Sequence, residues 1–337
     1  MVANGNSFKL DRVALAIAAT ASVLGLSTSA ASAQSIAIDG SSTVYPITEA
    51  MAEEFITANP GTNISVGVSG TGGGFSKFCG GETDISNASR PIKPEEMQAC
   101  AEAGIEYIEI PVAYDAITVV IHPENDWATE MTVEQLAAIW SPDSQGVNNW
   151  SEIDSSWPDR PLTLYGPGTD SGTFDYFTDE IVGEEGASRS DYTASEDDNI
   201  LVIGVEGDPN ALGYFGYAYY IENQDRLQSV AVDGVKPSPE TVDNGTYTPL
   251  SRPIFIYVRQ DALERPEVAS FVDFYLGNAA DVVADVGYVA LSPEAYSRGM
   301  ELVENGTVGT VYATNDVSGL GLLEVLNLSR TLEAPAE

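Results

Sequence analysis

The chain has 337 residues, of which 51 are acidic and 14 are basic, so its formal net charge at pH 7 is −37. A surface this acidic repels nucleic acid and anionic membranes, which disfavours both as partners. A hydrophobic content of 43% is ordinary for a globular protein and gives no support for a disordered chain.

Residues 1–33 have the features of a secretory signal peptide. Lys9 and Arg12 supply positive charge, residues 13–26 form an apolar run, and residues 31–33 (ASA) are a small-residue cleavage site. The apolar run is shorter than the ~20 residues that a membrane span requires. We therefore expect export, cleavage after residue 33 and a periplasmic location. The ~300 residues that remain exceed what one hydrophobic core usually organises, so we expect two lobes.

Three units of strand, Gly/Ser/Thr-rich loop and helix start recur along the mature chain. Strands are expected at residues 35–39, 63–68 and 162–166, and they lead into the loops GSSTVYP, SGTGGG and PGTDSGT. Helical periodicity follows in ITEAMAEEFITANP, FSKF and FDYFTDEIV. The first N–H groups of a helix lack partners and carry partial positive charge, so such loops can bind an oxyanion mainly through neutral groups.

Each of these loops has a plain alternative, because Ser, Thr and Gly are also ordinary residues at helix N-termini. Three such loops in one chain favour a shared anionic ligand. None continues into the G-K-[ST] of a P-loop, and none is a G-x-G-x-x-G fingerprint, so nucleotide binding is disfavoured.

A fourth segment, TDISNASRPI at residues 83–92, predicts a buried strand that ends at Arg90. The arginine stands beside Ser89 in a chain with few cations. Its planar guanidinium pairs well with phosphate or carboxylate oxygens, so it is a candidate anion contact. The alternative is an isolated surface charge.

Cys79 and Cys100 are the two cysteines of the chain. Export predicts an oxidising compartment, so we expect a disulfide between them. The alternatives are two free thiols or half of a metal site. The metal site is disfavoured because such sites usually use more Cys and His ligands, and the single histidine, His122, is distant in sequence.

Catalysis has little support in the sequence. Ser171 in GTDSGTF offers a hydroxyl, but a nucleophile needs a base, and one unplaced histidine is more often structural. No S-x-x-K with companion motifs is present, and paired carboxylates for glycoside hydrolysis cannot be picked out of so many acidic residues. We therefore expect a binding protein without enzymatic activity, cofactor or metal.

Four ordered motifs, IDGSSTVYPI, VSGTGGGF, DISNASRPI and GPGTDSGTFDYF, resemble those of the phosphate-binding proteins of bacterial ABC phosphate importers, the PstS family. The similarity is greatest to the branch with NASRPI and GTDSGTF. The resemblance implies an α/β, two-lobe periplasmic binding protein fold of type II, with the ligand cleft between lobes joined by two crossover strands at residues 116–123 and 253–260. Lobe 1 would comprise residues 34–116 and 258–337, and lobe 2 residues 117–257.

The resemblance also implies a set of phosphate contacts. By position these fall on Thr43, Val44, Tyr45, Thr71, Ser171, Gly172 and Thr173, with Thr169 as a further candidate. Better-studied members have a proton-accepting aspartate where this chain has Ser89, so Ser89 and Arg90 join the set and Arg90 is expected to supply the positive charge. Asp39 and Asp170, each beside a contact loop, are candidates for the missing acceptor.

On this interpretation the chain is an exported, monomeric receptor that binds inorganic phosphate with high affinity and delivers it to an ABC permease in the membrane. The alternatives are a binding protein for sulfate or arsenate, and a secreted phosphatase-like or adhesion protein. The acidic surface is similar to that of proteins from salt-loving organisms, where high ionic strength screens self-repulsion.

Overall fold

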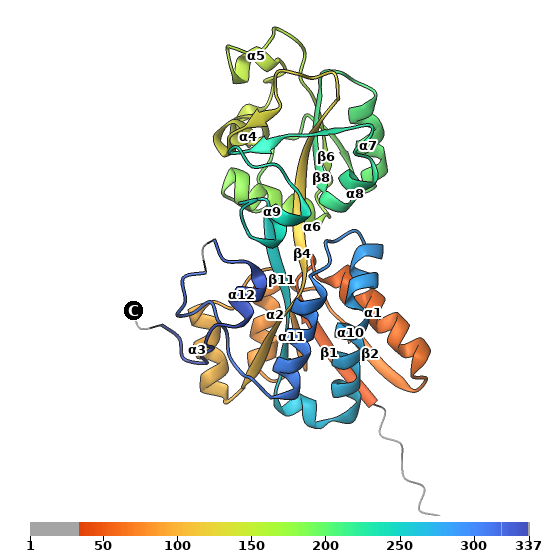
Figure 1. Ribbon diagram of the computed structural model, residues 1–337, viewed down its shortest axis with the longest axis vertical. Coiled ribbons are helices and arrows are strands. Elements are labelled where there is room, and N and C mark those ends of the chain that lie inside the picture. The colour runs from red at the N-terminus through yellow and green to blue at the C-terminus, as the bar shows by residue number, and fades with distance from the viewer. Residues whose placement is uncertain (1–33, 318, 336–337) are drawn as a thin grey trace, which may run out of the picture. The chain divides into compact units, whose positions relative to one another are not determined.

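The computed structural model describes residues 34–317 and 319–335, which form an α/β fold (Figure 1). The signal peptide expected at residues 1–33 lies outside the described residues. No helix within the described ranges is both long and apolar enough to cross a membrane.

The strands and helices follow one another along the whole described chain. The strands are β1 (Gln34–Gly40), β2 (Thr62–Val66), β3 (Ile85–Ala88), β4 (Tyr107–Ile121), β5 (Glu130–Met131), β6 (Thr163–Pro167), β7 (Thr193–Ser195), β8 (Ala211–Gly216), β9 (Gln228–Ser229), β10 (Ala231–Val232) and β11 (Ser251–Arg259). The α-helices are α1 (Tyr45–Ala58), α2 (Gly70–Cys79), α3 (Pro94–Ala103), α4 (Val133–Trp140), α5 (Trp150–Ile153), α6 (Gly172–Phe177), α7 (Asp198–Glu206), α8 (Tyr217–Glu222), α9 (Pro239–Asp243), α10 (Pro266–Asp285), α11 (Pro293–Glu304) and α12 (Leu322–Leu326).

The main sheet has the strand order β2-β1-β3-β11-β4-β8-β6-β7, with β9 also paired to β4. Strands β2, β1 and β3 are parallel neighbours, whereas β11 runs antiparallel to both β3 and β4. Figure 1 shows β1, β2, α1 and α10 near one end of β4 and β11, and β6, β8, α6 and α7 near the other. The helices therefore form two groups, one near each end of β4 and β11.

Strand β4 connects these two groups. All of its 15 residues are buried. It pairs with β11 up to Ala116 and with β8 from Ile117, so it changes partner between these two residues. The first crossing between lobes was expected at the same place in the chain, while the lobe boundaries themselves stay a prediction.

The strands expected at residues 35–39, 63–68 and 162–166 correspond to β1, β2 and β6, and Pro46 lies in the first turn of α1 as expected. One local prediction was wrong. The segment SGTGGG was expected to be a loop, but α2 begins at Gly70 and includes its glycines. A Cβ on Gly74 would lie 2.5 Å from the Gly40 Cα, so glycine lets the start of α2 pack against the end of β1.

The disulfide expected between Cys79 and Cys100 is confirmed. Cys79 is the last residue of α2, and Cys100 lies in α3. Both are buried in a hydrophobic cluster that also contains Phe75 and Tyr257. The bond therefore ties together the two helices that flank β3 in sequence.

Candidate functional site

A cavity of about 530 Å³ is lined by residues from distant parts of the chain. Its lining residues are Ser41, Ser42, Thr43, Gly70, Thr71, Gly72, Ser89, Arg90, Lys93, Asp175, Tyr176, Asp179, Glu185 and Arg252. The residues that come before position 90 supply hydroxyl and backbone N–H groups. The residues between positions 175 and 185 supply carboxylates. The cavity therefore has a wall of hydroxyl and backbone N–H donors, the hydroxyl wall, and an acidic wall of carboxylates.

The hydroxyl wall is a consequence of the sheet topology. Ser41 and Thr43 follow β1, Thr71 lies in the first turn of α2 after β2, and Ser89 follows β3. Because parallel strands end at the same edge of a sheet, these side chains converge. The hydroxyls of Thr71 and Ser89 lie 3.0 Å apart, and the Ser89 N–H donates to Thr71 Oγ1 at 3.2 Å. The start of α2 adds its first N–H groups beside them, whereas at the start of α1 the N–H groups of Thr43 and Tyr45 already donate to Ser41.

The predicted contact residues differ in where they lie. Thr43, Thr71, Ser89 and Arg90 line the cavity. Val44 is fully buried in the hydrophobic core, so only its backbone is available to a ligand. Tyr45 is the first residue of α1, and Thr169 is exposed in the turn before α6; neither lines the cavity.

The third predicted loop reaches the site through Gly172. A Cβ on Gly172 would lie 3.0 Å from Thr43 Oγ1 and 3.2 Å from the Thr43 Cα, so the start of α6 touches the loop after β1. Ser171 Oγ accepts a hydrogen bond from the Thr173 N–H at 3.2 Å and caps α6, which is the plain role that the sequence left open. Thr173 lines a separate cavity of about 130 Å³. Direct contacts from Ser171 and Thr173 to a ligand stay predictions.

Arg90 is held within its own segment. Its two terminal nitrogens donate to the carboxylate of Glu96 at 2.9 and 2.8 Å, and Nη1 also donates to the carbonyl oxygen of Pro91. A bidentate pair of this kind neutralises the guanidinium charge and uses much of its donor capacity. Arg90 therefore lines the cavity with three of its five N–H donors already in use.

Arg252 was missed in the sequence and also lines the cavity. It lies on β11 directly opposite Asp115 on β4, and its Nε and Nη2 donate to Asp115 Oδ2 at 3.4 and 3.2 Å. Its guanidinium carbon lies 3.6 Å from the centre of the Tyr176 ring. A signal for it exists in the sequence, because the tetrapeptide SRPI occurs twice, at residues 89–92 and again at residues 251–254.

The carboxylates that face the cavity are not the expected ones. Burial raises the pKa of Asp39, but hydrogen bonds from Lys77 and Ser69 outweigh this effect and lower it, and Asp39 does not line the cavity. Asp170 is exposed and also lies outside the lining. Asp175 does line it, and burial together with nearby Glu185 raises the pKa of its carboxyl group. Asp175 on the acidic wall is therefore a candidate proton acceptor for a ligand.

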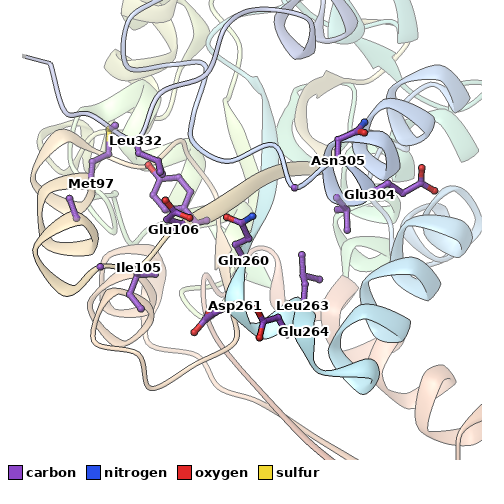
Figure 2. Close-up of a pocket in the computed structure, with 15 residues that line it drawn as sticks. Met97, Ile105, Glu106, Gln260, Asp261, Leu263, Glu264, Glu304, Asn305 and Leu332 are labelled. Carbon is purple, nitrogen blue, oxygen red and sulfur yellow. The ribbon is translucent and has the colours of Figure 1, made fainter.

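A larger hollow of about 870 Å³ lies elsewhere, between the end of α3, the start of β4 and the ends of β11 and α11 (Figure 2). Its charged lining residues are Glu106, Asp261, Glu264 and Glu304, and none of the described residues that line it is basic. These carboxylates would repel an anion. The smaller cavity with the hydroxyl wall is therefore the candidate site for an anionic ligand.

The small cavity beside Thr173 contains Asp198, whose titration is testable. Burial raises the pKa of Asp198 to about 6, and Asp197 and Glu196 add to the effect. A raised pKa contributes stability that is present below the unfolded-state pKa and is lost as pH rises through about 6. Asp198→Asn should therefore raise the free energy of unfolding at pH 8 by about 3 kcal/mol and leave it nearly unchanged near pH 3, below the unfolded-state pKa. Urea denaturation at the two pH values measures the difference, and an equal gain at both would contradict it.

Comparisons with known proteins identify the family of the chain. The sequence profile of the PBP superfamily domain matches residues 26–279. Protein SphX of Synechocystis sp. is 48% identical over 335 residues, which cover 97% of this chain and 100% of that protein. Phosphate-binding protein PstS of Staphylococcus haemolyticus is 38% identical over 262 residues, 76% of this chain and 80% of that protein.

A solved structure shows the same architecture. The crystal structure of a possible phosphate binding protein from Planctomyces limnophilus superimposes with a TM-score of 0.78 at 46% identity, covering 81% of this chain and 98% of that one. The likeness establishes the two-lobe periplasmic binding protein fold. Since the superfamily profile matches residues 26–279 and a PstS protein is 38% identical over 80% of its length, the chain belongs to the PstS family of phosphate-binding proteins.

Proposed function

We propose that the chain binds inorganic phosphate with high affinity in the 530 Å³ cavity and delivers it to an ABC permease. The observation that carries this proposal is the convergence of Thr43, Thr71 and Ser89 with the starts of α1 and α2 at one edge of the sheet. An oxyanion with four oxygens needs several donors at once, and this wall supplies them. The names of the relatives support phosphate as the anion.

The physical basis of affinity is a set of charge-assisted hydrogen bonds. Each bond from a neutral donor to a charged ligand contributes about 1.5–3 kcal/mol net, and more when water is excluded. A chain with a net charge of −37 can bind an anion because these donors act over short distances. The overall negative field opposes approach of the ligand only weakly at high salt.

The acidic wall supports phosphate over sulfate. Phosphate carries at least one proton at neutral pH and can donate it to Asp175, whereas sulfate has no proton and would be repelled by the same carboxylate. The second candidate function, binding of another tetrahedral oxyanion, then reduces to arsenate, which is protonated like phosphate.

The protein is proposed to act outside the cytoplasm together with a membrane permease. The features of residues 1–33 support export to the periplasm, and the phosphate-binding relatives support a binding component that meets a membrane permease. That this component is a monomer is part of the proposal. A receptor of this kind is not an enzyme: it binds its ligand in a fixed ratio and releases it unchanged. Turnover of a phosphoester by the purified protein would favour the phosphatase-like alternative instead.

Calorimetry on the exported form of the protein tests the proposed function. Phosphate and arsenate should each bind with a stoichiometry of about one per chain, and sulfate should bind at least ~100-fold more weakly because it cannot donate a proton to the acidic wall. The titrations are run at high and at low salt. Absence of phosphate binding at both salt concentrations, or equal affinity for sulfate, would contradict the proposal.

A further inference from the structure

The cavity has three basic lining residues, and they differ in how much of their donor capacity is free. Arg90 is occupied by Glu96 and by a backbone carbonyl. Lys93 is exposed, so water competes for its charge. Arg252 donates from Nε and Nη2 to the same oxygen, Asp115 Oδ2. Its Nη1 makes no hydrogen bond to any residue that the structure describes. Arg252 therefore has donors left for a ligand.

The guanidinium of Arg252 is fixed in position by two buried partners. Asp115 is 4% exposed and stands opposite Arg252 in the β4–β11 ladder. Burial raises the pKa of Asp115, and the guanidinium opposes this effect and favours the ionised carboxylate. On the other side lies the ring of Tyr176, which is 1% exposed and donates from its hydroxyl to the Pro249 carbonyl oxygen at 2.6 Å. The cation thus has a carboxylate at its edge and an aromatic face over its plane.

Position in the fold distinguishes Arg252 from the other basic residues. It comes from β11 and contacts Asp115 on β4 and Tyr176 on α6, and β4 and β11 overlap the two segments expected to cross between the lobes. A fixed guanidinium loses little conformational entropy when a ligand binds, so each hydrogen bond that it forms contributes more to affinity. An exposed and flexible lysine has no such advantage.

We propose that Arg252 is the principal ligand-binding cation of the cavity, and that Asp115 and Tyr176 are positioning residues that orient its guanidinium. This inference rests on the proposed function, because it assigns a role within the same phosphate site. It replaces the expectation from sequence that Arg90 supplies the main positive charge.

Phosphate titrations of matched variants test the role of Arg252. Arg252→Met alone would leave Asp115 buried without a partner, so the informative variant is the double replacement Arg252→Met with Asp115→Asn, which keeps the pair uncharged. It should remain folded and bind phosphate about 100-fold more weakly than the parent. Arg252→Lys keeps the charge and loses the planar fork, so a loss of about 10-fold is expected. Arg90→Gln should lose less than Arg252→Lys.

Two further readouts separate ligand binding from a structural role. The loss of phosphate affinity in the double variant, relative to the parent, should be greatest at low salt and smaller at high salt, where the attraction between the guanidinium and the anion is screened. Tyr176→Phe keeps the aromatic face and should stay within about 3-fold of the parent, while Tyr176→Leu removes it and should lose about 10-fold.

The outcomes are distinguishable. A folded double variant that binds phosphate within about 3-fold of the parent, with the parent's salt dependence, overturns the role of Arg252 and leaves the proposed function standing. A larger loss for Arg90→Gln than for the double variant overturns it in favour of Arg90. A parent protein that binds no phosphate overturns both.

Discussion

Gly172→Val is expected to weaken phosphate binding by on the order of 100-fold while leaving the protein folded. A Cβ at this position would already lie 3.0 Å from Thr43 Oγ1 and 3.2 Å from the Thr43 Cα. Valine adds two methyl groups to that Cβ, so the start of α6 must move away from the loop after β1. The donors of that loop would then no longer meet the rest of the site.

The control for this prediction is Gly277→Val in α10, where an added Cβ meets no atom within 4 Å. It tests the general effect of valine in place of a helical glycine and should leave phosphate affinity unchanged. Calorimetry gives the affinities, and thermal unfolding shows whether each variant is folded. A folded Gly172→Val protein with the parent's affinity would show that the contact with Thr43 is not needed for binding.

Local sequence patterns were sufficient for the strands and helices that carry the hydroxyl wall. Strands β1, β2 and β6 and helix α1 each have a clear periodicity within a few residues, and Pro46 marks the first turn of α1. Helix α2 could not be predicted in this way. Glycine is a poor helix former, so GTGGG indicates a loop until the close approach of Gly74 to Gly40 is known.

The candidate site was predictable where it depends on strand ends. Thr43, Thr71 and Ser89 each follow a strand, and parallel strands bring their ends together whatever the details of packing. The meeting of Arg252 with Asp115 depends instead on the register of β11 against β4, which joins residues 137 positions apart. No local pattern encodes that register.

The acidic wall was hidden by composition. Asp175 is one of 51 acidic residues, and nothing in its neighbourhood distinguishes it from Asp170 in the same segment. The structure separates them, because Asp175 lines the cavity and its pKa is raised by burial and by Glu185, whereas Asp170 is exposed. Charge patterns therefore located an acidic surface, and only the fold identified which carboxylates face a ligand.

Arg330→Met is expected to lower the free energy of unfolding by about 3–5 kcal/mol at neutral pH, because it leaves a buried carboxylate without its cation. Glu109 is 1% exposed and accepts hydrogen bonds from the Tyr257 hydroxyl at 2.7 Å and the Thr310 hydroxyl at 2.5 Å. Arg330 Nη1 lies 3.5 Å from Glu109 Oε1 and donates to the carbonyl oxygens of Glu109 and Gly309 at 3.1 Å. The Arg330–Glu109 ion pair therefore links the segment around Arg330 to β4.

The pH dependence of this loss identifies its cause. Burial raises the pKa of Glu109, and the positive charge of Arg330 is the largest effect that opposes it. Without Arg330 the folded-state pKa of Glu109 rises further, so the variant's free energy of unfolding recovers as pH falls through that pKa toward the unfolded-state value.

Arg226→Met is the control. The ion pair of Arg226 with Glu206 is exposed and screened by water, so this variant should lose much less stability. Denaturant unfolding at pH 5 and pH 8 measures both variants. A deficit for Arg330→Met that is equal at the two pH values, or that is matched by Arg226→Met, would mean that the lost contacts are those of the backbone carbonyls and not the charge on Glu109.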